Sequence, residues 1–257
     1  MIINNWRNGF GNDKHTDILI QTDSATAMSF TMVDISWQGV GGGVVTNDSS
    51  TGSHPVIHSS TQSKFEGDSL LFSGNTYALT WKYVSTPISV LPNRDDLCVD
   101  FWIYIDGRDM RSYNDDLYIG FFGTAKTKPV TPDTSNFCGI HITYQPDDVY
   151  FKYVSGGTTR WSIGGTGLGL SENQWHHLAG IRYNRGDTFY RLYLDGFLIA
   201  TQDESNQGRL VDVVKVNCAE LKRGGDQTHR KFYVDEWRNS IGHYRWMSEF
   251  NVPNREF

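Results

Sequence analysis

The stretch that most constrains the fold runs from Asn173 to Thr201, where three strand patterns follow one another with only tight turns between them. Trp175–Tyr183 is rich in aromatic and aliphatic residues, Thr188–Leu194 alternates between two faces, and Phe197–Thr201 returns. Asp195–Gly196 predicts a two-residue type I′ turn, because that turn needs positive φ angles and glycine adopts them without a steric cost. The stretch therefore predicts an antiparallel three-stranded meander.

The rest of the chain continues this pattern. Strand-forming aromatic residues are abundant, with 14 Phe, 13 Tyr and 8 Trp, and no sustained helical periodicity is present. Further strands are expected at Val33–Trp37, Leu70–Phe72, Thr76–Tyr83, Cys98–Asp106, Leu117–Phe122, Phe137–Tyr144, Val149–Val154, Thr158–Ile163, Val211–Val216 and Lys231–Trp237. About a dozen short strands without a repeat predict an all-β protein of two packed antiparallel sheets.

Two motifs in the opening stretch, Trp175–Ala179 and Leu192–Gly196, resemble the signature of the laminin-G and concanavalin-A-like jelly-roll superfamily. Other segments are similar to the version of this domain found in tailed-bacteriophage virion proteins. These segments are Thr61–Gly74, Val99–Ile103, Tyr233–Arg238, Arg245–Trp246 and Phe250–Pro253. They follow the expected order, so the resemblance implies a concanavalin-A-like jelly-roll sandwich.

The resemblance divides the chain into two parts. It covers residues 34–257 and leaves residues 1–33 outside. The N-terminal part contains the apolar run Asp17–Thr22, which could form a short strand, but it is too short for a core of its own. Two alternatives are consistent with it: an edge strand added to the sandwich, or an attachment arm that docks on another subunit, and we favour docking.

The net charge of −6 does not indicate the basic surface that nucleic acid or an anionic membrane requires, so neither is an expected partner. The residues Cys98, Cys138 and Cys218 are odd in number and lack metal-ligand spacing, which favours a reducing place of assembly. The first ten residues lack the apolar segment of a signal peptide, and no run is long enough to span a bilayer. We therefore expect synthesis in a host cytoplasm, without membrane insertion.

A catalytic role on this fold would most plausibly be glycoside hydrolysis, which uses two carboxylates. The E-x-D-x-x-E strand motif of the glucanase branch is absent. The acidic pair Asp235–Glu236 is adjacent, so in a regular strand its side chains point to opposite faces. We expect this pair to form ion pairs with Arg238 or Arg245, and we expect no catalytic residues and no enzymatic activity.

Two other kinds of residue could supply catalytic groups: histidines, and serine or cysteine nucleophiles. His176 and His177 are adjacent on an expected strand, so they cannot readily share one metal or base site. One is expected to pack inside and the other to face outward. No Ser or Cys has a recognisable nucleophile motif around it.

Calcium is an open alternative, because loop carboxylates supply the oxygen ligands that Ca²⁺ prefers. The candidate ligands are Asp106, Asp109, Asp115, Asp116, Asp147 and Asp148. Asp is also common in turns for backbone reasons, and no EF-hand spacing is present. We therefore expect no cofactor and no metal, with calcium as the alternative.

Aromatic and planar residues supply the candidate ligand-binding site. Trp102, Tyr104, Arg191 and Tyr193 fall on the strand face opposite the expected aliphatic core. Such a face suits stacking on sugar rings or a protein interface. The alternative is that overlying loops cover it.

The resemblance implies a non-enzymatic structural or adhesion protein of a tailed-phage virion, in a tail fibre, a tail tip or a capsid decoration. Its expected partners are host-surface glycans or other virion proteins, and a homo-oligomer, for instance a trimer, is expected because closed symmetry is common. One fold hosts many functions. Two alternatives therefore stay open: a glycoside hydrolase with carboxylates on separate strands, and a capsid cement protein without sugar binding.

Overall fold

The computed structural model of the chain describes residues 16–20, 35–36, 46–49, 56–65, 67–72, 80–87, 96–106, 115–124, 132–143, 148–168, 170–184, 188–204, 216–223, 231–242 and 244–252. Every regular element in these residues is a β-strand. Over the same residues, no helix has the length and apolar character needed to cross a membrane. The all-β prediction is confirmed.

Within the described residues, the larger sheet has nine antiparallel strands. Its main path runs β14-β13-β12-β7-β16-β1-β2, while β5 pairs with β16 and with β4. Its strands are β1 (Thr16–Ile20), β2 (Ile35–Ser36), β4 (Ile57–Ser59), β5 (Ser69–Phe72), β7 (Leu97–Asp106), β12 (Trp175–Asn184), β13 (Thr188–Leu194), β14 (Phe197–Glu204) and β16 (Lys231–Ile241). The predicted meander is present here as β12, β13 and β14.

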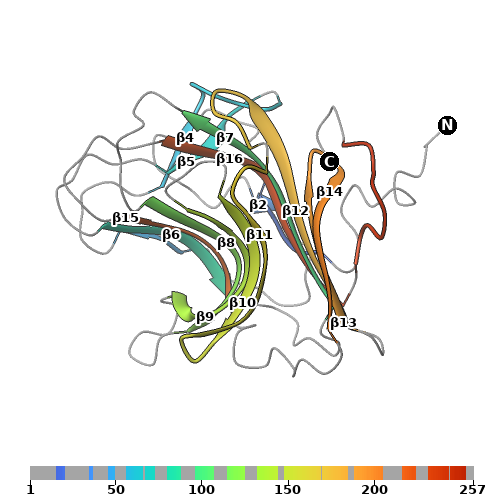
Figure 1. Ribbon diagram of the computed structural model, residues 1–257. Helices are drawn as coiled ribbons and strands as arrows, with labels where there is room; N and C mark the ends of the chain where they lie inside the picture. The colour runs from blue at the N-terminus through green and yellow to red at the C-terminus, as the bar shows by residue number, and fades with distance from the viewer. Residues whose placement is uncertain are drawn as a thin grey trace.

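In the part of the chain that the structure describes, the smaller sheet has seven antiparallel strands in the order β11-β10-β9-β8-β15-β6-β3. Its strands are β3 (Thr46–Ser49), β6 (Thr80–Pro87), β8 (Asp115–Thr124), β9 (Pro132–Ile142), β10 (Val149–Ser155), β11 (Thr158–Gly165) and β15 (Val216–Arg223). The two sheets lie face to face (Figure 1). The strands of the seven-stranded sheet are strongly bent, and their hollow side faces away from the other sheet (Figure 1). We call this the hollow face.

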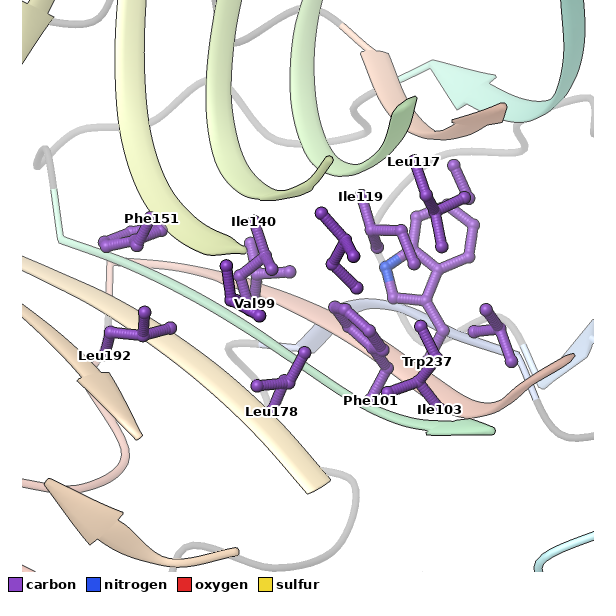
Figure 2. Packing of buried hydrophobic residues seen from close by; sticks show 14 of the residues in the cluster. Val99, Phe101, Ile103, Leu117, Ile119, Ile140, Phe151, Leu178, Leu192 and Trp237 are labelled. Carbon is purple, nitrogen blue, oxygen red and sulfur yellow. The ribbon is translucent and has the colours of Figure 1, made fainter. Parts of the chain in front are cut away.

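The core fills the space between the sheets. Every second residue of β7 points into it and is at most 1% exposed, namely Leu97, Val99, Phe101, Ile103 and Ile105. Figure 2 shows Leu117, Ile119, Ile140 and Phe151 of the seven-stranded sheet facing Phe101, Leu178, Leu192 and Trp237 of the nine-stranded sheet. Burial of such side chains stabilises a protein by about 1.5–3 kcal/mol each, so this alternation accounts for the two-layer fold.

The turn between β13 and β14 has the predicted geometry. Asp195 and Gly196 have φ angles of 51° and 84°, both positive as a type I′ turn requires. Gly196 is needed for a second reason as well, because a Cβ there would lie 1.9 Å from the carbonyl oxygen of Phe250. The turn therefore fixes both the meander and the place where the C-terminal tail approaches it.

Strand β1 comes from the N-terminal part of the chain and lies between β16 and β2. Thr16–Ile20 therefore adds a strand to the nine-stranded sheet, although not at the edge that the sequence suggested. The rest of that segment lies outside the described residues, and docking on another subunit stays a prediction.

One strand lies later in the chain than the sequence indicated. The expected strand Val211–Val216 overlaps β15 only at Val216, and its other residues lie outside the described part. β15 continues through Ala219 and Leu221, which face the core, and Cys218 and Glu220, which face the opposite side. The alternation is hard to recognise in the sequence because the polar Asn217 is buried on the core-facing side and Cys218 lies on the outward side.

Candidate functional site

The four sequence-predicted site residues lie on the outer face of the nine-stranded sheet, but that face is largely covered. Tyr104 and Arg191 are not brought together, because they lie opposite Trp175 and Ile181, which are well separated along β12. Trp102 is 5% exposed and Tyr193 is fully buried, whereas Tyr104 and Arg191 are partly exposed. Neither buried ring presents a face to solvent, so stacking of these two rings on a sugar would require the covering segments to move. Their role in ligand binding stays a prediction.

The C-terminal tail, residues 244–252, is the main cover. The rings of Trp246 and Phe250 stack at 4.2 Å, and Phe250 lies 5.4 Å from the ring of Tyr193. The Phe250 N–H donates to the Gly196 carbonyl at 3.0 Å, and Arg191 donates to the carbonyl of Met247. These contacts hold the tail across β12 and β13.

A second segment covers Trp102. The Lys64 ammonium lies 3.9 Å from the Trp102 ring centroid, and Phe65 meets the same ring edge to face at 5.9 Å. The Lys64 N–H donates to Asp235 Oδ2 at 3.1 Å. Burial lowers the pKa of Lys64 from its ordinary value, against the opposing effect of Asp195 and Asp235. The covering segment is thus fixed by a cation–π contact and a hydrogen bond.

Beneath the tail lies a buried ion pair. Arg238 donates to both oxygens of Asp100, at 3.1 and 2.8 Å, and both residues are fully buried. Burial alone raises the pKa of Asp100, but the Arg238 charge and the neighbouring His177 outweigh it and lower the pKa to about 2. Arg238 was expected to pair with Asp235 or Glu236. The two-point ion pair with Asp100 was not among the expected pairings, and a pair with Asp235 or Glu236 stays a prediction.

The Asp235–Glu236 pair sits on a β-bulge of β16, where Glu236 adopts a φ of 49°. The simple alternation of a regular strand therefore does not apply to it. Asp235 is 4% exposed and accepts from the backbone N–H of Glu236 at 2.9 Å as well as from Lys64. Arg245, the other expected partner, donates to Ser240 Oγ at 2.8 Å.

The hollow face of the seven-stranded sheet carries a second group of polar and aromatic residues. Glu220, Tyr118, His141 and Tyr150 lie directly opposite one another on β15, β8, β9 and β10. Because their neighbours along each strand point into the core, these four side chains share the face away from it. Tyr118 and Tyr150 are partly exposed, while Glu220 is fully buried and His141 is 6% exposed.

His141 joins two charged residues on this face. Its Nδ1 lies 2.6 Å from Lys152 Nζ, and its Nε2 lies 2.9 Å from Asp116 Oδ1. An ammonium group can only donate, so Nδ1 accepts and the Nε2–H donates to Asp116. The result is a directed chain from Lys152 through His141 to Asp116.

Aromatic rings frame this chain. Tyr118 stacks on His141 at 4.2 Å, and Phe137 meets Tyr118 edge to face at 5.3 Å. Burial, together with the negative charges of Asp116 and Glu220, raises the pKa of Tyr118, so the phenol stays protonated and can donate a hydrogen bond. Gly139 leaves room for Phe137, because a Cβ there would lie 2.9 Å from the Phe137 ring and 2.3 Å from the Ile119 carbonyl oxygen.

His176 and His177 are both buried, at 6% and 0% exposed, which corrects the expectation that one of them faces outward. His177 lies under the tail, 3.7 Å from Asp100 and edge to face with Trp102. His176 lies at the start of β12, where Nδ1 is 2.7 Å from Asp195 Oδ2 and Nε2 is 3.0 Å from Ser171 Oγ. A serine therefore does lie beside an imidazole, although no sequence motif marks it.

The carboxylates considered for calcium are only partly described. Asp116 is bonded to His141, and Asp148 accepts from Thr143 Oγ1 at 3.2 Å. In the described part of the chain, no group of three or more His, Cys, Asp or Glu side chains could hold a metal ion. Asp109 and Asp147 lie outside it.

The sequence did contain a signal for the hollow face. Tyr118, His141, Tyr150 and Lys152 occupy the positions that alternate with the core residues of three expected strands. What the sequence lacks is the pairing order, because β8, β9 and β10 are adjacent only after the sheet has formed. The contact between Ser171, His176 and Asp195 could not be found for the same reason.

A bent seven-stranded sheet packed face to face on a nine-stranded sheet defines a lectin-like two-sheet sandwich. The chain belongs to the concanavalin A-like lectin/glucanases superfamily, whose family model matches residues 80–238. The predicted concanavalin-A-like jelly roll is confirmed. No curated protein sequence matches this chain.

Solved structures share this fold at low sequence identity. The receptor-binding domain of botulinum neurotoxin D is 12% identical with a TM-score of 0.55, over 94% of this chain and 50% of that one. The binding domain of botulinum neurotoxin DC, solved in complex with rat synaptotagmin II, is 11% identical with a TM-score of 0.52, over 93% and 49%. A protein of unknown function from Shewanella oneidensis is 14% identical with a TM-score of 0.55, over 90% of both chains. The chain spans about half the length of the neurotoxin binding domains. Because the sequence identities are only 11–14%, these likenesses support the fold alone.

Proposed function

We propose that the protein is a carbohydrate-binding module and that the hollow face of the seven-stranded sheet is its binding surface. The observation that carries this proposal is the Lys152–His141–Asp116 chain beside the partly exposed rings of Tyr118 and Tyr150. Sugars are bound by aromatic rings that stack on their apolar faces and by fixed polar groups that bond their hydroxyls. Both kinds of group are held here in one orientation.

The test is binding of the purified full chain to a glycan array, with and without calcium, followed by titration of the best ligand. Tyr150→Ala and Lys152→Met are expected to weaken binding at least about tenfold, since a lost ring contact or charged hydrogen bond is worth more than about 1.4 kcal/mol. Tyr104→Ala, on the other sheet, is the matched control for Tyr150→Ala. If Tyr104→Ala weakens binding and Tyr150→Ala does not, the ligand binds the sequence-predicted face with Arg191.

We further propose that this module serves a tailed-phage virion, in a tail fibre, a tail tip or a capsid decoration. The support is the resemblance of Thr61–Gly74 and of the C-terminal segments to phage versions of the domain. Its partners would be host-surface glycans and other virion proteins, in a homo-oligomer assembled in the host cytoplasm. Mass spectrometry of purified particles tests the location, and light scattering tests the oligomer. A folded chain that binds to the particle but to no glycan would instead be a cement protein.

A second candidate function is glycoside hydrolysis by carboxylates on separate strands. It is favoured by one observation: Asp116 of β8 and Glu220 of β15 lie on neighbouring strands and on the same hollow face. That chemistry needs one carboxylic acid and one carboxylate around the scissile bond. Turnover of a polysaccharide panel that Asp116→Asn and Glu220→Gln each abolish would establish it. Turnover that persists in both variants would exclude this pair.

A further inference from the structure

A chain of hydrogen bonds with one fixed direction links Ser171, His176 and Asp195. Ser171 Oγ lies 3.0 Å from His176 Nε2, and His176 Nδ1 lies 2.7 Å from Asp195 Oδ2. The backbone N–H of Ser171 also points at Nε2, at 3.2 Å, and a backbone N–H can only donate. Nε2 is therefore the unprotonated nitrogen, and the Nδ1–H donates to the carboxylate.

Gln174 fixes the direction at the other end of this chain. Its side-chain Nε2 donates to Ser171 Oγ, and an amide nitrogen can only donate. The hydroxyl proton of Ser171 is then free to point at His176. Ser171 and Gln174 are both exposed, whereas His176 is 6% exposed, so the oxygen faces solvent and the imidazole beneath it does not.

The backbone holds these groups in place. Asp195 lies in the type I′ turn, donates its N–H to the His177 carbonyl at 2.8 Å, and accepts the His177 N–H on Oδ1 at 2.8 Å. The Asn173 N–H donates to the carbonyl of Ile105 at 2.8 Å. Asn173 and Asp195 both have positive φ angles, 62° and 51°, a backbone conformation that is uncommon outside glycine and is enriched at functional sites.

We propose that Ser171 is a nucleophile that accepts the acyl group of ester substrates, with His176 as its general base. The Ser171 hydroxyl proton moves to His176 Nε2 as Oγ bonds to the ester carbonyl carbon, and the C–O bond to the alcohol then breaks. The departing alkoxide takes that proton from His176. A water molecule, deprotonated by His176, releases the acyl group as a carboxylic acid and restores the serine.

The other two residues have supporting roles. Asp195 is a positioning residue, because it keeps the proton of His176 on Nδ1 and so leaves Nε2 able to accept. The amide of Gln174, already in contact with Oγ, supplies a donor for the oxyanion that forms on the ester. Because Ser171 is exposed at a turn, an ester carried on a polymer can reach it. This activity is separate from ligand binding at the hollow face.

The test is covalent labelling of the full-length chain with a fluorophosphonate probe and turnover of p-nitrophenyl acetate. We expect the label on the peptide that contains Ser171 and a loss of at least about a hundredfold in labelling rate in Ser171→Ala. Ser248→Ala, which removes another exposed serine, is the matched control and is expected to label like the parent chain.

Asp195→Asn separates chemistry from folding, because Asn-Gly forms the same turn as Asp-Gly. It is expected to lower kcat at least about tenfold with little change in KM and in the unfolding midpoint. A folded parent chain that the probe does not label, or equal labelling of the parent and Ser171→Ala, would overturn the proposal. So would a kcat for Asp195→Asn equal to that of the parent, because the carboxylate would then have no part in the reaction.

Discussion

Asp100 and Arg238 form a two-point ion pair, with N···O distances of 3.1 and 2.8 Å, that joins neighbouring strands β7 and β16 under the C-terminal tail. Both side chains are fully buried. Removal of one partner leaves an uncompensated buried charge, whereas removal of both does not. Arg238→Met is therefore expected to lower the free energy of unfolding by about 3–5 kcal/mol.

The matched variant is the double mutant Asp100→Asn with Arg238→Met, which is expected to lose less than the sum of the two single variants. Urea unfolding of the four proteins measures the coupling. Additive losses would mean that the two charges do not stabilise one another in the folded protein.

The same pair predicts how stability depends on pH. The pKa of Asp100 falls from an ordinary 3.8 to about 2 on folding. The stabilisation is therefore fully present above pH 3.8 and is lost as the pH falls through 3.8 towards 2, for a total of about 2 kcal/mol. Unfolding free energies measured between pH 5 and 2 are expected to fall less steeply in Asp100→Asn. Parallel curves would contradict the prediction.

Because the C-terminal tail covers Cys98 and not Cys138, we expect its loosening to change the reactivity of only one of these two thiols. Cys98 packs under Trp246, whereas Cys138 lies in the core between the sheets. Phe250→Ala removes the ring that stacks on Trp246, so it is expected to speed the reaction of Cys98 with a thiol reagent at least about tenfold while leaving Cys138 protected. Burial raises the pKa of the Cys98 thiol, so slow reaction in the parent chain is expected as well.

Peptide mapping after a timed pulse of reagent identifies the labelled cysteine. Phe197→Ala removes a ring of the same size that is 64% exposed, so it is the control and is expected to change nothing. Equal acceleration at Cys98 and Cys138 in Phe250→Ala would indicate global unfolding instead of movement of the tail.

Removal of the Asn239 side chain, which lies between the two sheets, is expected to lower the stability of the protein strongly. This side chain donates to the Gly120 carbonyl and to Asn217 Oδ1 of the other sheet, each at 3.0 Å, and accepts from Trp237 Nε1 at 2.9 Å. Asn239→Ala is expected to cost about 3 kcal/mol in urea unfolding, because it removes these bonds in a buried place. Asn136→Ala, which loses a bond to the Gly156 N–H at the surface, is expected to cost about 1 kcal/mol or less.

The local chemistry of the chain was sufficient to predict much of the fold. Alternation in Cys98–Asp106 and Thr188–Leu194 marked two strands and their core faces, and Asp195–Gly196 marked the turn between β13 and β14. These predictions rest on interactions between residues close in the sequence, so they did not need the tertiary structure. The strand β15 was predicted to end at Val216, where it begins, because the buried polar residue Asn217 breaks the pattern of core-facing apolar residues.

The candidate site depended on contacts between distant residues. The sequence placed Trp102 and Tyr193 opposite the core, but only the structure shows that Phe65, Trp246 and Phe250 cover them. The tertiary structure likewise brings His141 together with Tyr118 and Lys152 across three strands.

By itself, the sequence determined that this chain alternates into strands, turns at Asp195–Gly196 and belongs to a two-sheet class. The tertiary structure decided which polar residues are buried together, as for Asp100 with Arg238, and which lie at the surface beside an imidazole, as for Ser171 with His176. The physical reason is that side-chain alternation is a property of one strand, whereas strand order and the path of the tail are set by packing over the whole chain.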